Sequence, residues 1–66
     1  MKQPKLTEPE DIKLESLISA TLRELVFVDH HAEHDQIDDA QTCLVTVQGN
    51  LEQIEQLLQN AVTRAS

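Results

Sequence analysis

The sequence has no tryptophan or tyrosine, and Phe27 is its one aromatic residue. Without rings to stack on bases or a glycine-rich loop to hold phosphate, neither a base-stacking surface nor a nucleotide pocket is expected. Cys43 is the single cysteine, which excludes an internal disulfide and is typical of a reducing compartment. No stretch approaches the roughly 20 apolar residues that a membrane-spanning helix needs. We therefore expect a cytoplasmic protein with no membrane association and no cofactor.

Positive charge is also scarce. The chain has five Lys and Arg against twelve Asp and Glu, which gives a formal net charge of −7. No Lys or Arg lies between Glu24 and Thr63, a stretch that contains eight carboxylates. A phosphate backbone is bound by clustered cations, so direct nucleic acid binding is not expected.

A chain of 66 residues forms one domain at most, here residues 1–66. A core of this size usually contributes only about 3–5 kcal/mol to stability, and small proteins are commonly reinforced by disulfides, metals or oligomerisation. With no disulfide available, association with a second copy or with another protein is the expected reinforcement.

The first helix is predicted at about residues 8–29, after a flexible arm at residues 1–6. Thr7 followed by Glu10 matches the capping box, and Pro9 suits the first turn of a helix. Beyond this start, apolar residues recur at steps of three and four, which indicates one broad apolar stripe. The stripe contains Leu14, Leu17, Ile18, Thr21, Leu22, Leu25 and Val28.

The second helix is predicted at about residues 36–64, with Asp35 as its N-terminal cap. Its apolar residues alternate steps of three and four over more than three heptads, the a/d pattern of a helix seam. This predicted seam contains Ile37, Ala40, Leu44, Val47, Leu51, Ile54, Leu58 and Ala61.

An alternative fold stays open at this point. Residues 42–48 are rich in β-branched side chains and alternate in polarity, and Gly49 and Asn50 could form a turn. Pairing this segment with a strand near residues 25–29 would give an α-β-β-α arrangement. The heptad pattern that continues through Gly49 favours the all-helical reading.

A short turn at about residues 30–35 between two long helices predicts an antiparallel hairpin. Both stripes are wider than one helix contact covers, so the hairpin is expected to dimerise into a four-helix bundle or to bind another protein. In length and layout it is similar to plasmid copy-control proteins and to small acidic co-chaperones of type III secretion, with no shared motif. The predicted interface residues are Leu14, Ile18, Leu22, Leu25, Val28, Ile37, Leu44, Val47, Leu51, Ile54 and Leu58.

Three histidines lie in the predicted turn. His30 and His34 are four residues apart, and His31 and His34 are three apart, spacings that place two imidazoles on one helical face as metal ligands. No established metal motif is present, so no metal is favoured and these residues are only candidate ligands. The surrounding carboxylates favour the protonated form of these histidines, so the charge of the turn is expected to change near neutral pH.

The function predicted from these features is non-enzymatic protein binding through an apolar helical seam, as an adaptor, co-chaperone or small regulator. Cys43 has no neighbouring cation to activate it, and no catalytic grouping is recognisable. Two alternatives remain: a metal- or pH-responsive regulator that uses the histidines, and an acidic mimic of nucleic acid that inhibits a DNA- or RNA-binding protein.

Overall fold

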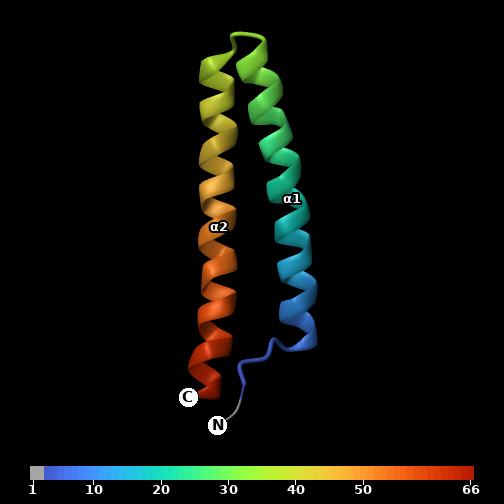
Figure 1. The fold of residues 1–66 in the computed structure, drawn as a ribbon, viewed down its shortest axis with the longest axis vertical. Coiled ribbons are helices and arrows are strands. Elements are labelled where there is room, and N and C mark those ends of the chain that lie inside the picture. Colours follow the sequence, from blue (N-terminus) through green and yellow to red (C-terminus); the bar gives the residue numbers. More distant parts are fainter. Residues whose placement is uncertain (1–2) are drawn as a thin grey trace.

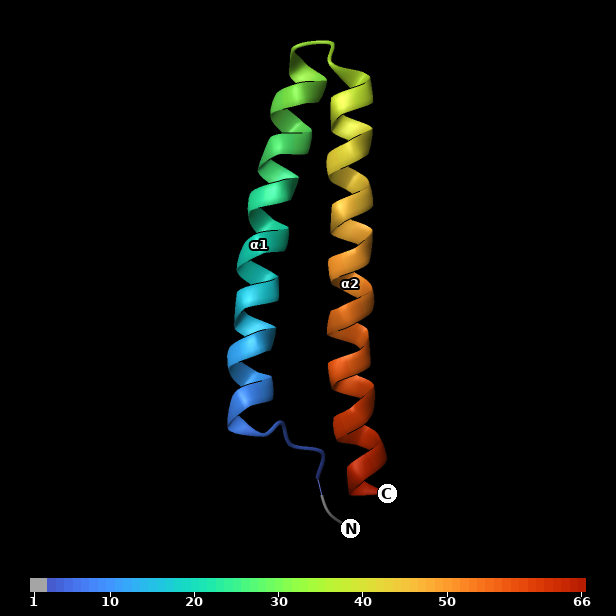
Figure 2. The ribbon, with the colours of Figure 1, turned by 180° about the vertical axis from the view of Figure 1, so that it is seen from behind.

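The computed structural model describes residues 3–66 and shows two helices packed side by side (Figure 1). Helix α1 spans Glu8–Glu33 and helix α2 spans Ile37–Ala65, and they run antiparallel. The hairpin is a rod of 51 × 17 × 14 Å, with the connecting turn at one end and the start of α1 beside the end of α2 at the other (Figure 2). The prediction of an all-helical hairpin is confirmed.

The α-β-β-α alternative is wrong. No strand occurs in residues 3–66, and residues 42–48 lie within α2. The helix accommodates the β-branched side chains of this segment because each costs only a few tenths of a kcal/mol, and Val47 is also buried in the contact with α1.

The start of α1 is fixed by the predicted capping box. The Glu10 amide donates to the Thr7 hydroxyl at 3.3 Å, and the Thr7 amide donates to the Glu10 carboxylate at 2.9 Å. These bonds satisfy two backbone donors that have no partner within the helix. Of the predicted arm, residues 1 and 2 lie outside the described part of the chain, and Gln3 to Leu6 have no regular structure.

The end of α1 lies four residues beyond the predicted boundary, at Glu33. Asp35 has φ of 59°, the left-handed conformation that ends many helices. The Gln36 amide donates to the His31 carbonyl at 2.8 Å and the Asp35 amide to the Ala32 carbonyl at 3.3 Å, which together form a Schellman motif. Residues 10–33 contain no Gly or Pro, so nothing after the first turn interrupts the helix before Glu33.

The prediction that Asp35 caps α2 is therefore wrong, because this residue belongs to the end of α1. The N-cap of α2 is Gln36, which makes no side-chain cap bond. Asp38 and Asp39 in the first turn instead compensate the positive end of the helix dipole.

The two helices meet along a heptad seam, the least exposed line of each. On α1 the seam residues are Glu10, Leu14, Leu17, Thr21, Glu24, Val28 and His31. On α2 they are Ala40, Cys43, Val47, Asn50, Ile54, Leu57 and Ala61. The predicted seam of α2 is thus half right, because Cys43, Asn50 and Leu57 occupy the places expected for Leu44, Leu51 and Leu58.

The core along this seam is thin. Only Thr21, Ala40, Val47, Leu57 and Ala61 are classed as buried, and none of the described side chains is completely buried. The accessible area is 5222 Å². That is roughly 1,000 Å² more than the area of about 4,200 Å² expected for a compact monomer of this size. The hairpin by itself leaves much of its apolar surface in water.

Candidate protein interface

The largest candidate site is one long side of the hairpin, where apolar residues follow the seam at intervals of seven. These residues stand one position after a seam residue, or, for Ile37, seven residues before one that does, so on both helices they flank the seam. In an antiparallel pair, these equivalent positions lie on the same side of the hairpin. We call this side the apolar face: Ile18, Leu25 and Ala32 of α1, and Ile37, Leu44, Leu51 and Leu58 of α2, with Leu22 and Val62 at its edges.

The large side chains of the apolar face are exposed. On α2 the exposed fractions are 61 % for Ile37, 41 % for Leu44, 51 % for Leu51 and 47 % for Leu58. Ile18 and Leu25 of α1 are each 43 % exposed. Isolated exposed apolar residues are ordinary, but a continuous patch of them marks a surface that binds another molecule.

A groove at the turn end shows that the two helices contribute to the same face. Its walls are Val28 and Ala32 from α1 and Ile37, Ala40, Gln41 and Leu44 from α2. Ala32 and Leu44 therefore line one hollow although they belong to different helices. Side chains that are long and apolar, such as those on an amphipathic helix, would fit such a groove.

The charged residues at the edge of the apolar face are all acidic. Five carboxylates occupy the same two sets of heptad positions as the face and its edges, and neither helix contributes a Lys or Arg there. Of the helix cations, Lys13 and Arg23 project on the other side and Arg64 lies at the seam. We call these carboxylates the acidic rim: Glu8, Asp11, Glu15, Asp29 and Glu55.

Arg64 links the two helices at the open end of the rod. Its guanidinium donates to both carboxylate oxygens of Glu10, at 2.6 and 2.9 Å, and to the Lys5 carbonyl at 3.0 Å. The bond from Arg64, helped by the Thr7 amide, lowers the pKa of Glu10 from 4.5 to about 2. The same pairing raises the pKa of Arg64. One side chain therefore holds the arm, the start of α1 and the end of α2 together.

Cys43 lies in the seam opposite Glu24 and is half-buried. Desolvation raises the pKa of the thiol, and the hydrogen bond to Glu24 and the charges of Glu24 and Asp39 raise it further. The thiolate is the nucleophilic form of cysteine, so this position is poorly suited to catalysis.

The three histidines do not converge on one point. The rings of His30 and His34 lie 4.3 Å apart between centroids, and His34 Nδ1 lies 2.8 Å from the His30 carbonyl oxygen. The His31 ring lies 5.7 Å from that of His30 between centroids, and its Nδ1 lies 2.8 Å from Gln36 Oε1. Within residues 3–66, no three His, Cys, Asp or Glu side chains are grouped so as to hold a metal ion.

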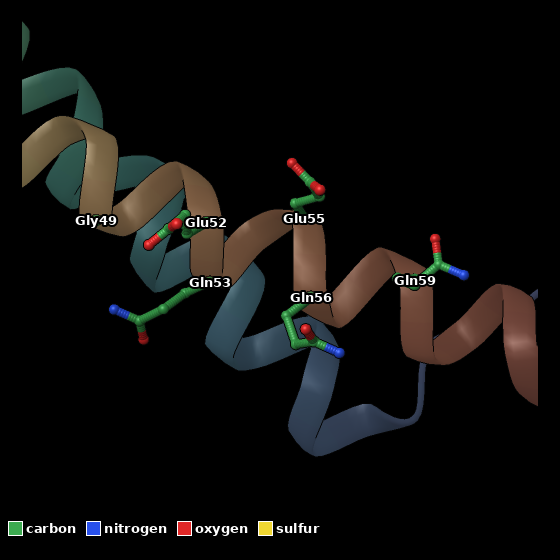
Figure 3. Close-up of a pocket in the computed structure, with 6 residues that line it drawn as sticks. All are labelled: Gly49, Glu52, Gln53, Glu55, Gln56 and Gln59. Atoms are coloured by element: carbon green, nitrogen blue, oxygen red, sulfur yellow. The ribbon is translucent and has the colours of Figure 1, made fainter.

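A second hollow runs along α2, from the rim residue Glu55 to the outward residues Glu52 and Gln59 (Figure 3). Its lining residues are Gly49, Glu52, Gln53, Glu55, Gln56 and Gln59, all from this one helix. Figure 3 shows the polar side chains fanning away from α2 rather than toward a common centre. The hollow is open surface above Gly49, which has no side chain, and it brings no reactive groups together.

The predicted interface residues divide into two groups. Leu14, Val28, Val47 and Ile54 are buried or half-buried in the seam within the chain. The other seven are exposed on the apolar face: Ile18, Leu22, Leu25, Ile37, Leu44, Leu51 and Leu58. The heptad pattern revealed both groups but could not separate them, because each recurs at the same spacing.

Neither described helix has the length and apolar content required to cross a membrane. Comparisons with protein family models, curated protein sequences and solved structures find no match for this chain.

Proposed function

We propose that this protein is a non-enzymatic interaction module that binds helices of another protein chain through the apolar face. The observation that carries the proposal is the row of Ile37, Leu44, Leu51 and Leu58, which repeats every seven residues and is at least 41 % exposed at each position. Such a row is the half of a helix–helix contact that the chain itself leaves without a partner.

The composition of the seam supports the same conclusion. The seam within the chain includes Glu24, Thr21 and Asn50. The row directly beside it on α1 (residues 11, 18, 25 and 32) has one charged residue, Asp11, and the row on α2 (residues 37, 44, 51 and 58) has none. Two exposed rows this apolar, with charged residues only at their border, have the composition of a protein interface.

The shape of the hairpin agrees with this proposal. Its accessible area is roughly 1,000 Å² above that of a compact monomer, because a rod of two helices has a single helix contact and leaves its other sides uncovered. Two helices from a second chain laid on the apolar face would complete a four-helix bundle. A second copy of this chain could supply such helices, and so could a different protein to which this chain binds as an adaptor, co-chaperone or regulator.

The test is to replace Leu51 by Asp and to measure mass in solution and helix content over a range of concentrations. A charge placed in a covered apolar surface has no partner there and opposes binding. If self-association covers the face, the parent gains mass and its thermal midpoint rises with concentration. The L51D variant should show neither change.

Val45→Asp is the matched control, because Val45 is also on α2 and is 62 % exposed but projects away from the apolar face. This variant should associate as the parent does. Equal losses in the two variants would point to a general loss of helix stability. A parent that stays monomeric at all concentrations would leave a different protein as the partner.

A further inference from the structure

The acidic rim indicates which kind of helix the apolar face accepts. We propose that the occupant of this face is a cationic amphipathic helix of another protein, one with apolar residues at heptad spacing and Lys or Arg on both flanks. The inference rests on the proposed function and adds the chemical character of the partner.

The argument begins with what borders the apolar face. Glu15 and Asp29 stand beside Leu22 along α1, and Glu55 stands between Leu51 and Leu58 along α2. None of these three carboxylates has an ion-pair partner within residues 3–66. A helix lying on the face would therefore have unpaired carboxylates of one sign along both of its sides.

A second copy would meet this arrangement with the same charges. Two apolar faces brought together would surround one interface with five carboxylates from each copy and with no Lys or Arg from either face. Like charges at an interface rim oppose association and select against that partner. A helix with cations at these positions gains the same apolar contact and has attraction in place of repulsion.

The distribution of the few cations strengthens this argument. The only ion pair between side chains in residues 3–66 uses Arg64, which is bound to Glu10 at the open end. Lys13 and Arg23 project away from the face. Within the two described helices no cation is placed to neutralise the rim, so a partner helix that carries cations would supply them.

The experiment uses two labelled synthetic helical peptides with identical apolar residues at heptad spacing, one flanked by Lys and the other by Glu. Binding to the intact chain is measured by fluorescence anisotropy at low and at high salt. The Lys peptide should bind at least about tenfold more tightly than the Glu peptide, and the difference should shrink as salt screens the rim. The Leu51→Asp variant should bind neither.

Two charge variants separate the rim from the net charge of the chain. The triple replacement Glu15→Gln, Asp29→Asn and Glu55→Gln removes three rim carboxylates. The matched triple replacement Glu33→Gln, Asp38→Asn and Glu52→Gln removes three from the outward side. Only the rim variant should lose most of its preference for the Lys peptide, since long-range charge is reduced equally in both.

The outcomes distinguish the two proposals. Equal binding of the Lys and Glu peptides, or equal effects of the two triple variants, would overturn the cationic partner and leave the apolar face as a binding surface. A tight dimer of the chain that excludes the Lys peptide would also overturn the cationic partner, and it too would leave the apolar face as a binding surface. If neither peptide binds and Leu51→Asp changes no property in solution, the proposed function itself fails.

Discussion

The guanidinium of Arg64 forms a two-pronged ion pair with the carboxylate of Glu10, 54 residues away in sequence. This pair joins the last turn of α2 to the first turn of α1, at the end of the rod opposite the connecting turn. Bidentate pairing of this kind is stronger and more specific in geometry than a single charge contact. It closes the open end of a hairpin that has a thin core.

Replacing Glu10 by Gln should lower stability in a pH-dependent way. Gln preserves the capping box, so the loss reports the ion pair alone. The pKa of Glu10 is lowered to about 2 in the folded chain, from 4.5. The stabilisation is therefore complete above pH 4.5 and is lost as the pH falls through about 2.

Thermal unfolding of parent and E10Q from neutral pH to pH 2 measures this effect. The gap between their midpoints should be widest near neutral pH and should close toward pH 2. Glu52→Gln is the control, because Glu52 makes no ion pair within residues 3–66. If the difference between the unfolding midpoints of the parent and E10Q stayed the same at every pH, the charge of Glu10 would not be what stabilises the hairpin.

Replacing Gly49 by Ala should raise stability by about 0.5–1 kcal/mol. Gly49 lies within α2 without a positive φ, and a Cβ added there would meet no atom within 4 Å. Denaturant unfolding followed by circular dichroism measures the gain. Gln48→Ala should change stability by less than about 0.5 kcal/mol, since both residues are good helix formers. A destabilised G49A variant would show that another chain packs closely against this point.

Replacing Asp35 by Gly should also stabilise the hairpin, by up to about 1 kcal/mol. Asp35 has φ of 59°, a conformation that is costly for residues with a Cβ and free of strain for Gly. Replacement by Val should have the opposite effect, because a β-branched residue is the least suited to this region. The order Gly, Asp, Val in unfolding midpoint is the expected result. An inverted order would mean that the turn has a different conformation in solution.

Cys43 should react with iodoacetamide more slowly than an unstructured cysteine at the same pH. Partial burial and the Glu24 carboxylate raise the pKa of its thiol, which lowers the fraction of thiolate. Glu24→Gln should speed the reaction by removing the neighbouring negative charge. Measuring the rate against pH separates this effect from helix opening, which would accelerate the parent and the variant alike.

The sequence predicted the elements well where local chemistry decides them. The capping box at Thr7 and Glu10 set the start of α1, and the heptad pattern predicted α2 through Gly49. The end of α1 was misplaced because its signal is the left-handed conformation of Asp35. Gly is the usual residue in this position and Asp is a common N-cap, so the sequence alone favours Asp35 as the cap of the next helix.

The rotation of α2 about its own axis could not be predicted. Leu44 and Cys43 are neighbours in sequence, and either can serve a heptad seam that also contains Val47 and Ile54. Hydrophobicity alone favours the leucines in the seam. In the structure Cys43, Asn50 and Leu57 pack against α1 instead, and Leu44, Leu51 and Leu58 are exposed. This outcome depends on how the two long helices fit together.

The absence of any completely buried side chain among the described residues also bears on the abundance of the protein in a cell. Chains with thin cores open often, and proteases cut them while they are open. If a partner covers the apolar face as proposed, it would withdraw the chain from that process in proportion to its own concentration. Copies made in excess of such a partner would then be degraded first, and turnover would match the amount of this protein to the amount of the partner.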